Sequence, residues 1–220
     1  MAITLSTGVS VQIAKTYAAA KPVTAASNSA PGANCVLTLD NATSAIAVGK
    51  FVEVSSGWGL LDKRLARVSV STGTAITLEG IDTSNTSKYP ALAGVGSVRE
   101  VTAWTGLSQI KGLSASGGDM QYANITAIDD VVAKQVPTIR NAVSMNIDCY
   151  DDPSLPWYAD VAAASDARSP YGLLMAFPNG SKLIANAYWS LQRVPSVTIN
   201  EAMTSQISLS YAAEPVRYAS

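Results

Sequence analysis

Histidine is absent from this 220-residue chain, and cysteine and charge are scarce. Without histidine, the chain lacks the usual general base, the Ser-His and Cys-His nucleophile pairs and the commonest metal ligand. Its two cysteines, Cys35 and Cys149, match no metal or redox spacing, so we expect small buried side chains in a reducing compartment. We therefore expect no enzymatic activity, no catalytic residue, no metal site and no cofactor.

Charged residues make up only 14% of the chain, whereas an average soluble domain has roughly 25%. The chain has 15 basic and 16 acidic residues, so its net charge is −1. This balance offers no basic cluster for sequence-independent nucleic-acid binding. A weakly charged surface protects poorly against self-association, which suits a subunit that is covered by its neighbours.

Long apolar runs are also missing. No run approaches the length of a membrane span, and the opening MAITLSTGVS lacks the basic region and apolar core of a signal peptide. We expect synthesis in the cytoplasm and no membrane association.

Alternation of polar and β-branched residues with a period of two runs through most of the chain and predicts a mainly β protein. Asn179-Gly180 lies between two such runs and predicts a hairpin, because Asn-Gly accepts positive φ. The clearest predicted strands are 8–14, 34–40, 51–54, 65–70, 74–82, 138–150 and 206–211.

One helix is predicted inside CYDDPSLPWYADVAAASDARSP, residues 149–170. Ser154 is the expected N-cap, because Leu155 and Pro156 then occupy the first two helical positions, where a proline costs no hydrogen bond. The helix should run to about residue 167, before Ser169-Pro170. The residues expected to cap the helix or pack it against the sheet are Ser154, Leu155, Trp157 and Tyr158.

Asp151 and Asp152 precede this helix and allow a second interpretation. A glycosidase needs two carboxylates that face each other about 5–10 Å apart, whereas adjacent residues of an extended segment point apart. We interpret the pair as charges beside the positive end of the helix dipole. The acid pair and four scattered aromatics, Trp58, Trp104, Trp157 and Trp189, still leave a carbohydrate-binding or depolymerising phage protein as the alternative.

Several motifs in the C-terminal half carry a family resemblance. They include WTGLSQIKGLSASGGDMQYANI, DDPSLPWY, FPNGSK and the terminal AEPVRY. With these motifs, residues from about 103 to 218 resemble the tail tube (major tail) protein of long-tailed bacteriophages, of siphophage type. A secretion-system or tailocin tube protein of similar fold is a further alternative.

The resemblance implies a β-sandwich or partly closed barrel flanked by one helix. It also implies that six copies form a ring in which the inner sheets join into one large barrel. Stacked rings would form a non-contractile tail tube that is built around the tape-measure protein and conducts DNA during ejection, without specific DNA binding. The implied partners are other copies of the chain, the tape-measure protein, and the tail tip or baseplate and tail terminator proteins. The implied location is the virion tail, assembled in the host cytoplasm.

We expect three parts: an N-terminal strand and arm (1–32), an inserted small β-rich module (33–102) and the tube core (103–220). By the same resemblance, the loop 127–137 reaches an adjacent subunit or ring through Asp129, Asp130, Lys134 and Gln135. The alternation in two strands also predicts side chains that face the lumen. These are Ser144, Asn146, Asp148, Gln206, Ser208 and Ser210.

Overall fold

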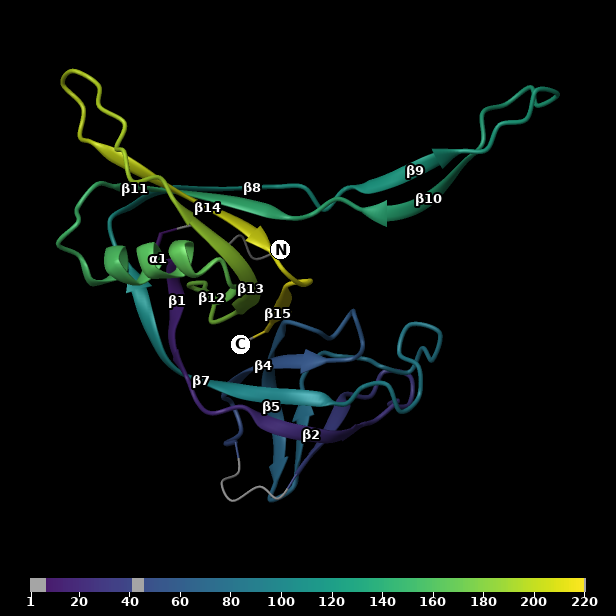
Figure 1. The fold of residues 1–220 in the computed structure, drawn as a ribbon. Coiled ribbons are helices and arrows are strands. Elements are labelled where there is room, and N and C mark those ends of the chain that lie inside the picture. The colour runs from purple at the N-terminus through teal and green to yellow at the C-terminus, as the bar shows by residue number, and fades with distance from the viewer. Residues whose placement is uncertain (1–6, 41–45, 220) are drawn as a thin grey trace.

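The computed structural model describes residues 7–40 and 46–219 and is mainly β with one helix, α1 (Pro156–Ala167) (Figure 1). This confirms the predicted fold class. The strands are β1 (Ser10–Tyr17), β2 (Lys21–Ala26), β3 (Cys35–Leu39), β4 (Phe51–Ser56), β5 (Arg64–Thr72), β6 (Ala75–Leu78), β7 (Gly96–Leu107), β8 (Ile110–Ser116), β9 (Met120–Asn124), β10 (Gln135–Arg140), β11 (Ser144–Tyr150), β12 (Tyr171–Ala176), β13 (Lys182–Leu191), β14 (Thr204–Tyr211) and β15 (Val216–Tyr218).

The larger sheet, which we call the tube sheet, has the strand order β7-β1-β12-β13-β14-β11-β8. Strand β15 pairs with the first residues of β13, on the same edge as β14. Its neighbouring strands are antiparallel, and α1 packs against β13, β7 and β1. The predicted Asn-Gly hairpin is present, since β12 pairs with β13 and Gly180 has a φ of 81°. The core between helix and sheet is centred on Trp157, Ile147 and Ile207, each with an exposed fraction of 0%.

The smaller unit, which we call the module, is a closed ring of six strands. Its order is β2-β3-β6-β5-β4-β7, and the first half of β7 pairs again with β2. The module encloses its own core around Trp58, Leu37 and Leu78. The predicted small β-rich module is therefore present. Strand β2, which lies within the predicted N-terminal arm (1–32), contributes to it. The division of the chain at residues 33 and 102 stays a prediction.

A third apolar cluster joins the module to the tube sheet. It includes Phe51 and Leu65 from the module and Ile184 and Tyr218 from the tube sheet. The Tyr218 hydroxyl accepts a hydrogen bond from the backbone N–H of Arg67 (2.9 Å) and donates to the backbone carbonyl of Glu79 (3.1 Å). Because β7 also runs through both units, the module is attached by continuous backbone and by packing.

Helix α1 lies where the sequence predicts it, but the predicted cap was wrong. The N-cap is Leu155, which provides no side-chain hydrogen bond, and Pro156 is the first helical residue. The Ser154 hydroxyl donates instead to Asp152 Oδ1 (2.6 Å), and the Ser154 N–H donates to the same atom (3.0 Å). This local turn uses the hydroxyl that a cap would need. Within the described residues, no helix has the length and apolar character to cross a membrane.

A long two-stranded arm projects from the tube sheet (Figure 1). It is the continuation of β8 and β11 into β9 and β10, and among the described strands these two pair only with each other. The predicted single strand 138–150 is therefore two strands, interrupted at residues 141–143. The predicted loop 127–137 is shorter than expected, because Gln135 already begins β10.

Candidate functional site

The six residues predicted to face the lumen lie on one face of two paired strands, β11 and β14. They stand directly opposite one another as Ser144–Ser210, Asn146–Ser208 and Asp148–Gln206. The Gln206 Nε2 donates to Asp148 Oδ1 at 3.0 Å. The alternate residues of both strands, among them Ile147, Ile207 and Leu209, are buried against the helix side. The pair of strands thus has one apolar face and one polar face.

The polar face extends over four adjacent strands, further than the sequence analysis indicated. Ser116 and Ser114 of β8 are opposite Ser144 and Asn146, and the hydroxyls of Ser116 and Ser144 are 2.9 Å apart. On the other side, Tyr188 and Ser190 of β13 are opposite Ser210 and Ser208. The serine alternation in IKGLSAS was a usable signal for β8. None of these positions is basic, so the face is broad, polar and nearly uncharged. We call it the polar face.

The arm residues Asp129, Asp130 and Lys134 lie in the turn at the tip, and Gln135 begins β10 (Figure 1). Asp130 is ion-paired with Lys134 and also accepts a hydrogen bond from the Ala127 N–H at 2.9 Å. The hydrogen bond from Lys134, followed by that from Ala127, lowers the pKa of Asp130. These contacts fix the shape of the turn from within, and Asp129 remains on its surface.

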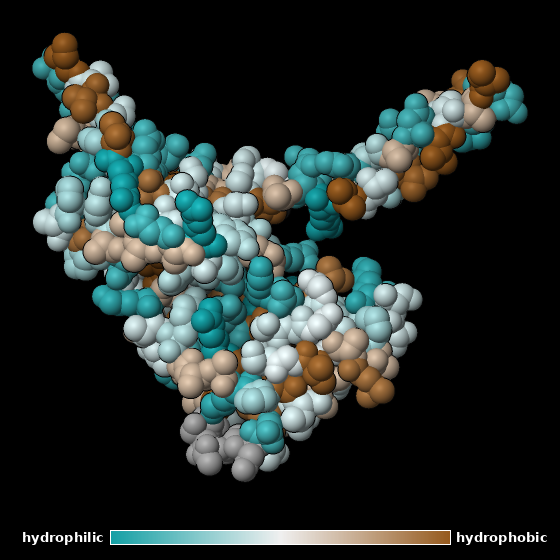
Figure 2. All heavy atoms as spheres, in the orientation of Figure 1, coloured by the Kyte–Doolittle hydropathy of each residue, from teal (hydrophilic) through white to brown (hydrophobic). Residues whose placement is uncertain are grey.

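The arm tip also exposes apolar side chains that the sequence analysis missed. Ile128 and Val131 have exposed fractions of 109% and 100%, and Val132 has 72%. Figure 2 shows brown apolar residues at the tip and along the arm. All residues of β9 and β10 are exposed, and an isolated two-stranded hairpin is marginal in water. Exposed apolar surface on such a projection is typical of contact sites.

The two aspartates before the helix are used in local structure. Asp151 accepts a hydrogen bond from the Ser205 hydroxyl (2.5 Å), and Asp152 accepts those from Ser154. The hydrogen bonds from Ser154 lower the pKa of Asp152. A glycosidase acid needs a raised pKa, so Asp152 is unsuited to that role.

The tryptophans do not form an exposed platform for a sugar. Trp58, Trp157 and Trp189 have exposed fractions of 1%, 0% and 4%. Trp104 is half-buried and contacts the Phe51 ring edge-on at 5.9 Å. The four tryptophans that motivated the carbohydrate-binding alternative are therefore explained by their packing against other side chains.

The buried charges of the module are also structural. Glu53 is 9% exposed and receives hydrogen bonds from the Arg99 guanidinium, the shortest at 2.9 Å. Burial raises the pKa of Glu53, and the Arg99 charge opposes that effect. Arg99 itself lies 4.1 Å from the centre of the Tyr17 ring. Among the described residues, no group of three or more acidic or cysteine side chains is placed to hold a metal ion.

Comparisons with solved structures give only partial matches. A chain of the anti-feeding prophage tube-terminating cap is 19% identical, with a TM-score of 0.36, 49% of this chain covered and 79% of that one. A chain of the anti-feeding prophage baseplate is 10% identical, with a TM-score of 0.39 and coverages of 54% and 86%. A chain of the sheath-tube complex of an extracellular contractile injection system is 19% identical, with a TM-score of 0.36 and coverages of 49% and 80%.

No curated protein matches the chain. The family model described as phage tail tube protein, TTP, matches residues 56–220, which is most of the chain and includes the polar face, the arm and α1. The chain belongs to the phage tail tube protein family.

Proposed function

We propose that six copies of this chain close into a ring, and that stacked rings form a tail tube whose channel conducts DNA during ejection. The observation that carries the proposal is the polar face, with its three matched pairs from Ser144–Ser210 to Asp148–Gln206. A channel wall must be polar on one side and packed on the other. No strand residue of the polar face is basic, and the Lys63 ammonium beside it is hydrogen-bonded to the Tyr188 hydroxyl (3.3 Å). The face would therefore make few ionic contacts to phosphate that would hold DNA in place.

The edges of the tube sheet support ring formation. Among the described strands, β8 pairs with β11 alone, and its apolar Leu113 is 39% exposed. An open edge of this kind invites pairing with another chain, and closure into a ring removes it. In the proposed ring, the polar faces of six copies join into one large barrel around the channel.

The arm is the proposed contact to an adjacent subunit or ring. Asp129, Asp130, Lys134 and Gln135 would contact that neighbour, and the exposed Ile128 and Val131 would be buried by it. A marginal hairpin becomes stable when a partner covers its apolar side chains. We expect a large contact area, because permanent assemblies of this type bury more than about 2,000 Å² per interface.

The proposed assembly has defined partners. The tube would be built around the tape-measure protein in the host cytoplasm and end at the tail tip or baseplate and at the tail terminator. In the virion it would belong to a non-contractile tail. DNA would be a transient occupant of the channel.

Negative-stain electron microscopy of the purified protein during concentration, together with light-scattering mass, tests the proposal. We expect rings or hollow tubes with six-fold end views. A stable trimer, or a mass that changes on addition of a glycan, would contradict it and support the carbohydrate-binding alternative.

A second experiment tests the arm. Replacement of residues 129–134 by Gly and Ser should leave the subunit folded, because the tip is outside all three apolar clusters. It should abolish stacking of rings. Tubes of normal length from this variant would refute the role of the arm, while leaving ring formation open to separate observation.

A further inference from the structure

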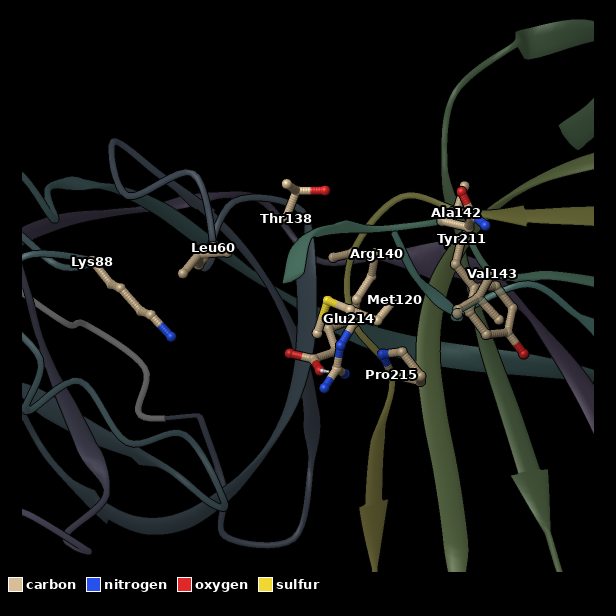
Figure 3. Close-up of a pocket in the computed structure, with 13 residues that line it drawn as sticks. Leu60, Lys88, Met120, Thr138, Arg140, Ala142, Val143, Tyr211, Glu214 and Pro215 are labelled. Carbon is tan, nitrogen blue, oxygen red and sulfur yellow. Dashed lines mark ion pairs between the residues drawn. The ribbon is translucent and has the colours of Figure 1, made fainter. Parts of the chain in front are cut away.

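A groove of about 760 Å³ lies between the base of the arm and the module (Figure 3). Leu60 and Lys88 line it from the module side, and Met120 and Tyr211 line it from the arm and the tube sheet. Leu60 is 51% exposed and Met120 is 37% exposed. The groove therefore presents apolar side chains to solvent, with the Lys88 ammonium beside them.

A second apolar projection lies elsewhere on the chain, in the loop 192–203 between β13 and β14. Val194, Val197 and Ile199 have exposed fractions of 75%, 71% and 88%. The loop is held in shape by two backbone hydrogen bonds between Ser196 and Thr204 (2.8 and 3.2 Å). It is a structured projection whose apolar side chains point away from every core of the described chain.

The tip of this loop is a tight turn. The Glu201 N–H donates to the Thr198 carbonyl at 3.2 Å, and Asn200 has a φ of 64°. Ile199 and Glu201 are thus neighbours at the tip, both exposed. At the base of the loop, Arg193 is ion-paired with Asp166 of α1 at 2.7 Å. The tip therefore combines an apolar side chain with an acidic one.

The loop and the groove lie at opposite ends of the same strand pair. Leu191 pairs with Ile207 at the loop end, whereas Ala187 pairs with Tyr211 at the groove end. In Figure 1 the loop projects at one side of the molecule and the arm at the other. A subunit cannot place this loop in its own groove, so the two surfaces are available only to different copies.

The charges of the two surfaces are complementary. Neither Lys88 in the groove nor Glu201 at the loop tip has an ion-pair partner among the described residues. The other charges at the groove, Arg140 and Glu214, pair with each other at 3.5 Å. Lys88 is thus the unpaired cation of the groove, and Glu201 is an unpaired anion on the loop.

We infer that the loop 192–203 of one copy docks in the groove of the next copy, with Ile199 against Leu60 and Met120 and with Glu201 beside Lys88. This inference rests on the proposed function and names the surfaces through which copies associate. The contact is head-to-tail, because the two surfaces differ. Such a contact closes into a ring or continues as a filament.

Charge reversal provides the first test. Glu201→Lys and Lys88→Glu each place like charges together, so each should raise the protein concentration needed for assembly by about tenfold or more. The double variant Glu201→Lys/Lys88→Glu should restore assembly to within a few-fold of the wild type. Asp40→Lys, at an exposed position directly after β3, is the matched control and should assemble as the wild type does.

The outcomes distinguish a failure of the docking inference from a failure of the proposed function. Unchanged assembly of both single variants beside normal wild-type tubes would overturn the docking inference and leave the tube intact. Wild-type protein that remains monomeric at every concentration would contradict the proposed function. Circular dichroism and the unfolding midpoint should match the wild type for all variants, since both positions are exposed.

Cross-linking provides a second test that does not depend on tubes. A mixture of Ile199→Cys and Leu60→Cys proteins should form a disulfide-linked dimer under a mild oxidant, because the native Cys35 and Cys149 are buried. Either variant alone should give much less dimer. Efficient cross-linking of Leu60→Cys to Ile128→Cys on the arm tip, in place of Ile199→Cys, would show that the arm occupies the groove and would overturn the inference.

Discussion

Trp157 is the largest side chain that α1 contributes to its interface with the tube sheet. It is fully buried in the main core, and its indole N–H has no hydrogen-bond partner among the described residues. Its contribution must therefore come from packing and from the apolar surface that it removes from water. The helix is held on the sheet chiefly through this residue, with Val161 and Ala164 one and two turns further along.

We predict that Trp157→Ala lowers the free energy of unfolding by about 3–5 kcal/mol, because it removes a large buried side chain and leaves a cavity. Urea denaturation of the monomer measures this. Ile128→Ala on the exposed arm tip is the control and should change the free energy by less than about 0.5 kcal/mol. Equal effects of the two variants would mean that α1 is not anchored as described.

The ion pair between Arg67 and Glu79 should make the stability of the protein depend on pH in the acidic range. Two hydrogen bonds of 2.6 Å from the Arg67 guanidinium lower the pKa of Glu79. A lowered folded-state pKa means that the pair stabilises the protein above the unfolded-state pKa of about 4.3, and that this stabilisation is lost as pH falls through the folded-state pKa. Wild-type stability should therefore fall more steeply below about pH 4.3 than that of Glu79→Gln.

Unfolding midpoints across the acidic range measure this difference. Titrating groups that both proteins share, including Glu53 with its raised pKa, cancel in the comparison. A Glu79→Gln curve parallel to the wild type throughout would show that the pair is not formed in solution.

From the sequence, the residues that share one face of a strand were easier to predict than the side chains that form ion pairs. The alternation in two strands put Ser144, Asn146 and Gln206 on one face, although their place in a channel stays a prediction. The Arg67–Glu79 and Arg99–Glu53 pairs could not be predicted, because each joins side chains of different elements: Glu79 directly follows β6 and Arg67 is on β5, whereas Glu53 is on β4 and Arg99 on β7. The predicted cap at Ser154 failed for a local reason: the helix begins one residue later, and the Ser154 hydroxyl is turned toward Asp152, to which it donates.

At the scale of elements, the junction between the tube sheet and the arm depends on glycine. Gly117 and Gly118 have φ values of 84° and 82°, and lie opposite the interruption at residues 141–143. The Asn141 N–H donates across the junction to the Asp119 carbonyl at 2.9 Å. The glycines therefore change the direction of a continuous hairpin. The Ser116-Gly117-Gly118 segment joins β8 to β9 without reversing the chain.

We predict that Gly117→Ala misplaces the arm. An added Cβ would lie 2.0 Å from the Ala142 carbonyl oxygen, and the positive φ disfavours any side chain. The arm should become more sensitive to protease and assembly should weaken, while the unfolding midpoint of the tube core stays close to the wild type. Gly112→Ala is the matched control, because nothing lies within 4 Å of its added Cβ.

Limited proteolysis and sedimentation measure the two effects of Gly117→Ala. Wild-type protease resistance and assembly in this variant would show that the junction tolerates movement. In the sequence the break is marked only by the polar Asn141, which interrupts the apolar series of Ile139, Val143 and Met145. Its cause lies on the partner strand, which is remote in the sequence.

At the scale of the whole molecule, three apolar clusters form a continuous series from α1 to the far end of the module. The cluster between the two units draws side chains from both, and Tyr218 at the C-terminal strand bridges to Arg67 and Glu79. This arrangement fixes the module relative to the tube sheet. The module should therefore keep one orientation when copies assemble, which leaves the polar face and the two projections in constant relative positions.

The reactivity of a cysteine at position 210 should show whether the polar face lines the channel. Ser210 is exposed in the single chain, at the end of the face beside Ser144 and Tyr188. If six polar faces surround a channel, this position is reachable only through the tube ends once rings have stacked. A cysteine introduced there should react with a small maleimide in both states. It should react with a polyethylene-glycol maleimide too large for the channel only before assembly.

Gel-shift analysis of Ser210→Cys before and after assembly measures this, and the buried Cys35 and Cys149 should give little background. Asp40→Cys, at an exposed position of the module directly after β3, is the control for general loss of reactivity on assembly. Protection of Ser210→Cys from the large reagent, with Asp40→Cys still labelled, places the polar face inward. Full labelling of Ser210→Cys in intact tubes would place it on the outer surface, and some other face of the sheet would then have to line the channel.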